Sequence, residues 1–320
     1  MTMSKLRRPS DLRSAIDGGL LSFPLTDFNA KNEFDAGGYR SRLDWLGEFG
    51  ASALFPAGGA GEYFSLTSKE YLSVINETVL WSNGRVPVIA SAGMGTCNAI
   101  EHAQAAERMG ADGILILPPY MTEASQGGLF AHISAICRAV SIGVIVYNRG
   151  NCRLTPQTVA RLAEACDNLI AIKDGIGSIE WLLTTRSLVG DRLLYINGMP
   201  TAEVYAAAYK AIGAPTYSSA IFNFIPRTAM EFHTAIKNGD SATVDRIFEA
   251  FFVPYLAIRN RQEGYAVSIV KAGATIVSRG AGEVRSPLSP LTHSERVELE
   301  RLIQALGPQQ PADLLAVERR

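Results

Sequence analysis

The 320-residue sequence has no apolar run long enough to span a membrane and no block of Lys and Arg residues. Its formal net charge is only −1. Nucleic acids and anionic membrane surfaces attract concentrated positive charge, so the sequence favours neither as a partner. The amino terminus leads from Met1 into further charged residues rather than an apolar segment, so we expect no signal peptide and a cytoplasmic location.

Cysteine is scarce, and its spacing does not suggest a metal site. The four cysteines are scattered, and the four histidines fall in helical patterns with no carboxylate or cysteine at ligand spacing. We therefore expect no metal and free thiols in a reducing compartment. The residues concerned are Cys97, Cys137, Cys152, Cys166, His102, His132, His233 and His293.

Short apolar runs alternate with segments of helical spacing along the first two thirds of the chain. The runs lack the strict alternation of a half-exposed strand, as is typical of parallel strands covered on both faces. Eight such runs, alternating with helices, predict an α/β fold, a (β/α)₈ TIM barrel. A doubly wound open sheet is the alternative, weakened because no Gly-x-Gly-x-x-Gly follows the first run. The runs are residues 21–25, 52–56, 86–90, 113–117, 144–147, 169–173, 193–196 and 215–218.

The strand pattern stops near residue 226 and only helical patterns follow. We expect a barrel core over residues 1–225. Residues 226–306 should supply the remaining barrel helix and a C-terminal helical extension packed on the barrel, and 307–320 a loosely ordered tail. The expected helices are 226–238, 241–262, 265–278 and 292–306.

Lys173 ends the sixth apolar run and is followed by Asp174 and Gly175. Burying a lysine lowers its pKa, because desolvation disfavours the charged form, and a neutral amine can attack a ketone to form a Schiff base. A lysine that merely tips a strand and reaches solvent fits the same pattern. The segment alone leaves both interpretations open.

Other polar and glycine residues gather at the expected carboxyl ends of strands, where such barrels hold their active sites. The turn Gly58–Gly61 could direct backbone N–H groups at a carboxylate, although an ordinary flexible turn has the same composition. Tyr147 could relay protons or simply pack with its hydroxyl in water. Similar strand-end positions are held by Tyr120, Asn148, Arg149, Gly198, Ser218 and Ser219.

In this order, over about residues 20–305, these features resemble the dihydrodipicolinate synthase/N-acetylneuraminate lyase superfamily of class I aldolase-type barrels. The resemblance rests on Gly-x-x-Gly-Glu at Gly58–Glu62, on Tyr147-Asn148, and on Lys173 at the end of the sixth strand. Within the superfamily the chain is most similar to a branch of decarboxylating dehydratases. The distinguishing segments are residues 55–67, 147–149, 172–180, 198–203 and 215–224.

The resemblance implies that a keto sugar diacid is dehydrated and decarboxylated through an imine with Lys173, with no other cofactor and no metal. Tyr147 would relay protons, and the amides of Gly59 and Ala60 would hold the carboxylate next to the ketone. Gly198 with Ser218 or Ser219 would line the pocket, and Asn148 and Arg149 would bind substrate. Tyr120 would reach the site of a neighbouring subunit in a homo-oligomer, a tetramer of two dimers.

Two departures from the superfamily pattern concern the same pocket. Synthase-type members carry two threonines where this chain has Gly59 and Ala60, so no hydroxyl stands there to link Tyr147 into a relay. The arginine that synthases place after the Tyr-Asn pair is displaced, and Arg149 and Arg153 are both candidates to replace it. Another pyruvate-type aldolase or synthase of the superfamily, and a non-catalytic keto-acid-binding homologue, remain alternatives to the dehydratase.

Overall fold

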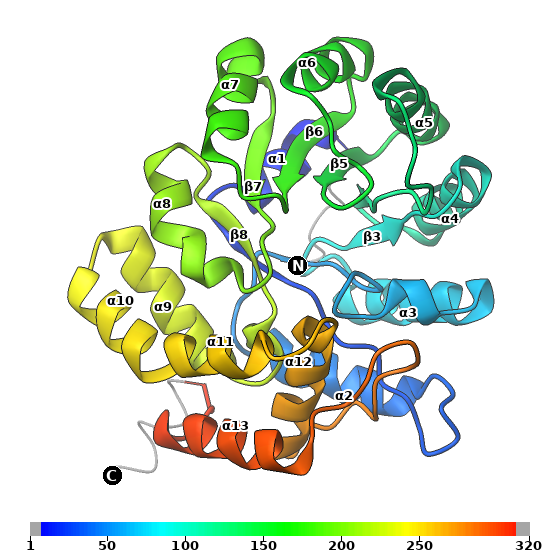
Figure 1. Ribbon diagram of the computed structural model, residues 1–320. Coiled ribbons are helices and arrows are strands. Elements are labelled where there is room, and N and C mark those ends of the chain that lie inside the picture. The colour runs from blue at the N-terminus through cyan, green and yellow to red at the C-terminus, as the bar shows by residue number, and fades with distance from the viewer. Residues whose placement is uncertain (1–7, 312–320) are drawn as a thin grey trace.

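The computed structural model describes residues 8–311, and within them eight strands form one parallel sheet. The strand order is β2-β1-β8-β7-β6-β5-β4-β3, and a bridge between Leu54 and Val88 joins the two ends of that order. The sheet therefore closes on itself, which confirms the predicted (β/α)₈ barrel and excludes the open sheet (Figure 1). The strands are β1 (Leu20–Ser22), β2 (Ala53–Leu54), β3 (Ile89–Ala92), β4 (Gly113–Ile116), β5 (Gly143–Asn148), β6 (Leu169–Asp174), β7 (Leu194–Asn197) and β8 (Thr216–Ser219).

Helices surround the barrel (Figure 1): α1 precedes β1, and α2 to α8 follow β1 to β7 in turn. Their ends agree with local sequence signals. Thr155 caps α6 with Pro156 at its first position, and Gly110 ends α4 at a φ of 102°. The α-helices up to β8 are α1 (Pro9–Ile16), α2 (Ala36–Gly47), α3 (Ser68–Ser82), α4 (Thr96–Met109), α5 (Gln126–Ala139), α6 (Pro156–Ala165), α7 (Ile179–Val189) and α8 (Ala206–Ala211). The 3₁₀ turns are η1 (Tyr63–Ser65), η2 (Gly190–Arg192), η3 (Ala202–Tyr205) and η4 (Ile221–Asn223).

The apolar core has two layers, one inside the barrel and one between the strands and the helices. Alternate strand residues such as Leu115, Ile145 and Ala171 fill the interior, and Leu12 of α1 packs with them. Their neighbours Ile114 and Val144 pack outward against the helices. All six residues of β5 and of β6 are buried, which explains why these strands show no polar alternation in the sequence.

The C-terminal helices lie between α8 and α2 and complete the ring (Figure 1). Phe251 and Ile269 of this part pack in one cluster with Leu20 and Tyr217 of the barrel strands. The single helix expected over 241–262 is instead two α-helices joined by a π-helical turn, and it ends at Arg259. The elements are α9 (Pro226–Asn238), α10 (Ser241–Ile247), η5 (Phe248–Phe252), α11 (Val253–Arg259), α12 (Tyr265–Ile276) and α13 (His293–Ala305).

The tail is described only as far as residue 311. There, Gln309 accepts a hydrogen bond from the Thr228 amide of α9 at 3.2 Å, and residues 312–320 lie outside the described part. All four cysteines are free thiols. In residues 8–311 no helix has the length and apolar character needed to cross a membrane.

Candidate active site

A cavity of about 510 Å³ opens at the carboxyl ends of the strands. Its walls come from loops around the barrel, including Tyr63 after β2, Leu117 after β4 and Thr201 after β7. Ala266 and Val267 of α12 form part of the wall, so the C-terminal helices contribute to the cavity directly. The lining is mostly apolar, with a few polar groups, which is the usual make-up of a small-molecule site.

Lys173 reaches this cavity from β6 with only 3% of its surface exposed. Its Nζ lies 3.6 Å from the centre of the Tyr147 ring and 5.0 Å from that of Phe23. Burial lowers the pKa of the Lys173 amine below its ordinary value of 10.5, against the opposing effect of Tyr147. Because the side chain is buried, the alternative that Lys173 ends a strand and extends into solvent does not apply.

Asp174 fixes the strand end that carries Lys173. Its carboxylate accepts hydrogen bonds from the backbone amides of Ile176 and Gly177, and from the Tyr209 hydroxyl at 2.6 Å. Its backbone carbonyl accepts the Gly198 amide at 2.7 Å. The peptide after the lysine is therefore held from both sides, which limits the positions that the amine can take.

The Tyr147 hydroxyl has two partners at the cavity wall. It donates to the Gly198 carbonyl at 2.6 Å and accepts from Nη1 of Arg149 at 2.9 Å. Burial by itself would raise the pKa of the Tyr147 phenol, but the positive charges of Lys173 and Arg149 outweigh it and lower that pKa below 10. Ala60 has no hydroxyl with which to bond Tyr147, and Arg149 is the side chain that donates to it.

The Gly58–Gly61 turn lies beside the cavity and contains backbone amides that make no hydrogen bond within residues 8–311. The turn is closed by hydrogen bonds from the Glu62 amide to the Gly59 carbonyl and from the Tyr63 amide to the Gly58 carbonyl. Within residues 8–311 the amides of Gly59 and Ala60, both of which line the cavity, donate to no protein acceptor. Two neighbouring free amides suit a carboxylate oxygen. We call Gly59 and Ala60 the amide cradle.

Of the two candidate arginines, only Arg149 lines the cavity. Its Nη1 is used by Tyr147, while Nε and Nη2 have no acceptor among residues 8–311 and remain available to a carboxylate. Arg153 is exposed and donates to the Gly150 carbonyl at 3.3 Å.

Three predicted site residues do not line the cavity. Asn148 is fully buried and its Oδ1 accepts the Leu154 amide at 2.9 Å, while Ser219 donates to the buried Glu203. Tyr120 lies outside the cavity with 68% of its surface exposed. Ser218 and Gly198 do line it.

Sequence reasoning missed several parts of the wall. Phe23 follows the first strand, so the strand-end rule applied to β1 would have found it. Ala266 and Val267 carry no chemical signal and come from a helix far along the chain, so nothing in the sequence pointed to them. Across residues 8–311 no three His, Cys, Asp or Glu side chains are placed to hold a metal ion.

Comparisons with known proteins agree with this geometry. The model of the Dihydrodipicolinate synthetase family matches residues 17–306. A relative from Paracidovorax citrulli, named "Probable 5-dehydro-4-deoxyglucarate dehydratase", is 57% identical over 302 residues, covering 94% of this chain and all of the relative. One of the same name from Acidovorax ebreus is 58% identical over 300 residues, covering 94% of this chain and 99% of the relative.

Solved structures give the same fold. The dihydrodipicolinate synthase from Bacillus clausii superposes with a TM-score of 0.85 at 26% identity, covering 93% of this chain and all of that one. The enzyme from Oceanobacillus iheyensis superposes with a TM-score of 0.86 at 25% identity, covering 93% of this chain and 99% of that one.

Proposed function

The chain belongs to the dihydrodipicolinate synthetase family, and on that premise we propose that it is a decarboxylating dehydratase. It would convert 5-dehydro-4-deoxy-D-glucarate to 2,5-dioxopentanoate, carbon dioxide and water through a Schiff base. The observation that carries the proposal is the buried amine of Lys173, placed beside Tyr147 in a cavity that also holds the amide cradle and Arg149. Relatives at 56–58% identity that bear the dehydratase name support the choice of substrate.

The first step joins the substrate to the protein. The neutral amine of Lys173 adds to the ketone, and the resulting carbinolamine loses its hydroxyl as water to give an iminium. The amide cradle holds the carboxylate next to the ketone, so the carbonyl carbon faces Nζ. Tyr147, with its lowered pKa and its bond to Arg149, supplies and recovers the protons of this step.

The iminium then acts as the electron sink for the elimination. The adjacent methylene loses a proton to give an enamine, and the enamine expels the neighbouring hydroxyl as water. The distal carboxylate, which Arg149 would hold, leaves as carbon dioxide, and the electron pair of the broken bond returns toward the nitrogen. The carbon that lost the carboxylate is left as an enol, which tautomerises to the aldehyde. Protonation of the enamine carbon restores the iminium, and its hydrolysis releases 2,5-dioxopentanoate and free Lys173. The covalent imine is the only cofactor that the proposal requires.

We further propose that the protein is a cytoplasmic homo-oligomer. Phe64 and Met94 line the cavity, and Tyr120 and Met121 directly follow Pro119, which also lines it; these four large apolar side chains have 43–68% of their surfaces exposed. Clustered exposed apolar residues are typical of interaction surfaces, and a second copy would cover them. Sedimentation velocity that returns only a monomer would contradict this part.

The proposed reaction is tested by supplying the keto diacid without pyruvate and measuring carbon dioxide and 2,5-dioxopentanoate. Borohydride reduction during turnover should add the ligand's mass to the peptide that contains Lys173. The variant Lys173→Ala should lose both turnover and adduct while keeping its thermal midpoint, because a buried amine contributes little to the fold. A requirement for pyruvate would instead indicate an aldolase or synthase. Saturable binding without an adduct would indicate a keto-acid-binding homologue.

A further inference from the structure

Glu62 directly follows the turn Gly58–Gly61, which contains the amide cradle and is called the cradle turn below. Its side chain is completely buried, so the charge of its carboxylate must be balanced by groups from elsewhere in the chain. Its Oε1 lies 2.7 Å from Nζ of Lys271 on α12, which is itself only 3% exposed. Its Oε2 accepts the backbone amide of Arg285 at 2.9 Å. Glu62, which lies next to the amide cradle, is therefore held by two groups from residues more than 200 positions later in the sequence.

Lys271 is fixed as tightly as the carboxylate that it meets. It donates to the Glu283 carbonyl at 3.0 Å, and its Nζ lies 4.1 Å from the centre of the Phe28 ring. The same helix provides Ala266 and Val267 to the cavity wall. Movement of α12 would consequently displace both the wall and the anchor of the cradle.

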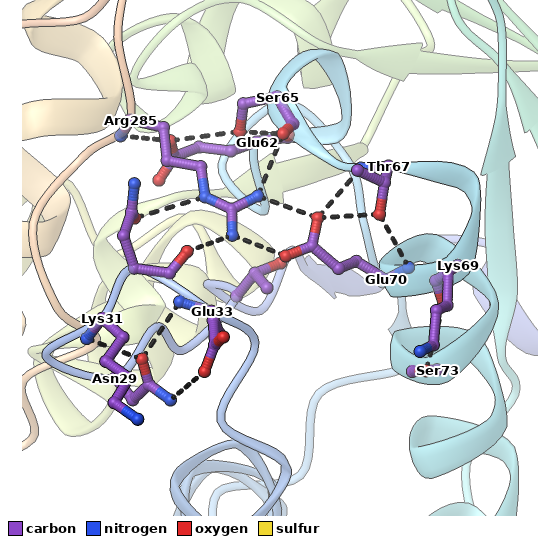
Figure 2. Close-up of polar contacts among 12 residues, drawn as sticks. Asn29, Lys31, Glu33, Glu62, Ser65, Thr67, Lys69, Glu70, Ser73 and Arg285 are labelled. Carbon is purple, nitrogen blue, oxygen red and sulfur yellow. Dashed lines mark hydrogen bonds and ion pairs between the residues drawn. The ribbon is translucent and has the colours of Figure 1, made fainter.

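Arg285 forms the second set of contacts around Glu62. Figure 2 shows its guanidinium reaching Glu70 at the start of α3, with bonds of 2.6 and 3.0 Å, while Glu62 lies against its backbone. A further bond of 3.0 Å goes to the Ser65 carbonyl. The segment before α13 is thereby tied to both ends of the connection between the cradle turn and α3.

The cradle turn needs such support because its backbone is strained. Ala57 and Glu62, on either side of the four residues Gly58–Gly61, have φ values of 49° and 55°. Residues other than glycine adopt this region only where the surroundings hold them there. Glu62 is thus both a strained residue and the one whose side chain is anchored.

We propose that Lys271 is a positioning residue, which acts through Glu62 to hold the amides of Gly59 and Ala60 where a substrate carboxylate meets them. The inference rests on the proposed function, since it assumes a keto acid bound through an imine to Lys173. The Lys271 side chain does not line the cavity, and its ion pair with Glu62 connects it to the turn.

The test compares two probes that differ only in the carboxylate. Pyruvate carries a ketone next to a carboxylate, whereas in acetone a methyl group replaces the carboxylate. Each is trapped on the full-length protein with borohydride, and the adduct at Lys173 is measured by peptide mass. Loss of positioning should slow trapping of pyruvate by about 10- to 100-fold and leave trapping of acetone unchanged, because only pyruvate uses the amides.

Three variants separate positioning from stability. Lys271→Met leaves Glu62 buried without its partner and should lower the thermal midpoint. The double variant Glu62→Met, Lys271→Met removes both charges and should recover much of that midpoint, since an apolar pair of similar size replaces a buried ion pair well. Arg296→Met, the control, removes the exposed ion pair to Glu283 in the same segment without touching Glu62.

The expected result is a selective loss of pyruvate trapping in the double variant and no change in Arg296→Met. Pyruvate trapping within about twofold of the wild type in a folded double variant would overturn the inference, and so would an equal loss with both probes. A wild type whose Lys173 forms an adduct with neither pyruvate nor 5-dehydro-4-deoxy-D-glucarate would contradict the proposed Schiff-base function itself, and the inference with it.

Discussion

Replacing Gly198 with alanine should disable Lys173 without unfolding the protein. A Cβ atom at position 198 would lie 2.5 Å from Cγ of Lys173, 2.7 Å from its Nζ and 3.0 Å from the Asp174 carbonyl oxygen. Ordinary contacts begin at 3.4 Å, and the carbonyl belongs to a strand that cannot retreat. The lysine side chain must therefore move, by about 1 Å.

A displacement of about 1 Å at a reacting group costs on the order of 100-fold in rate. Because Gly198 also accepts the Tyr147 hydroxyl, a shift of its backbone would separate the amine from its proton partner and add to this loss. Crowding of this kind typically costs about 1–3 kcal/mol of stability, which a barrel of this size should tolerate.

The assay is kcat/KM from the release of 2,5-dioxopentanoate, accompanied by the rate of borohydride trapping at Lys173 and by the thermal midpoint. Gly127→Ala is the matched control, because its new Cβ would meet only Oγ of Ser125 at 3.9 Å, far from the cavity. A folded Gly198→Ala protein with kcat/KM within about threefold of the wild type would refute the reasoning, since an unshifted amine is incompatible with the contact distances.

Two further predictions concern charged groups. Arg149→Met should lower kcat/KM by about 10- to 100-fold through the loss of charged hydrogen bonds. One of the positive charges that lower the pKa of the Tyr147 phenol is then gone, so the limb of the pH–rate profile that this phenol sets should move to higher pH. Arg153→Met, a change outside the cavity, should alter neither kcat/KM nor this limb. Burial raises the pKa of Glu203 from 4.5 to about 7, so the folded state keeps a proton that the unfolded chain releases, and stability falls as pH rises between these values. Glu203→Gln should therefore have a higher thermal midpoint than the wild type at pH 8, with the difference closing toward pH 4.5, and an equal difference at both pH values would contradict this.

The sequence predicted the barrel because each strand is a compact apolar run, and all eight runs overlap the strands observed. The predicted run at 86–90 begins three residues before β3, which spans Ile89–Ala92, and ends two residues before β3 does. Val86 and Val88 looked like strand residues, but Val88 instead forms the single bridge to Leu54. The expected helix 241–262 was too long, because the adjacent Phe251 and Phe252 are both buried through a π-helical turn that apolar periodicity does not reveal.

The sequence predicts which residues lie at the carboxyl ends of strands. It is a weaker guide to which of their side chains face the cavity. Lys173 and Tyr147 could be placed at the cavity because they are paired across neighbouring strand ends. Ser218 and Ser219 are adjacent, so they point to opposite faces, and only the register with β1 tells which faces the cavity. The same alternation puts Arg149 beside Tyr147 and turns Asn148 away, a signal that was present in the sequence. The contact of Lys271 with Glu62 could not be foreseen, since it joins residues 209 positions apart through tertiary packing.

The closure of the barrel through one bridge, from Leu54 of β2 to Val88 just before β3, has a consequence for its slow motions. β2 has only two residues, whereas β5 and β6 share a ladder of six-residue strands. Amide hydrogens near Leu54 should therefore exchange with solvent well before those near Ile172, because local opening there breaks few hydrogen bonds. The cradle follows the weakly paired strand, and Lys173 stands on the strongly paired one. A keto acid bound to both would link the two sides, so slower exchange at Leu54 would report its arrival without any measurement of turnover.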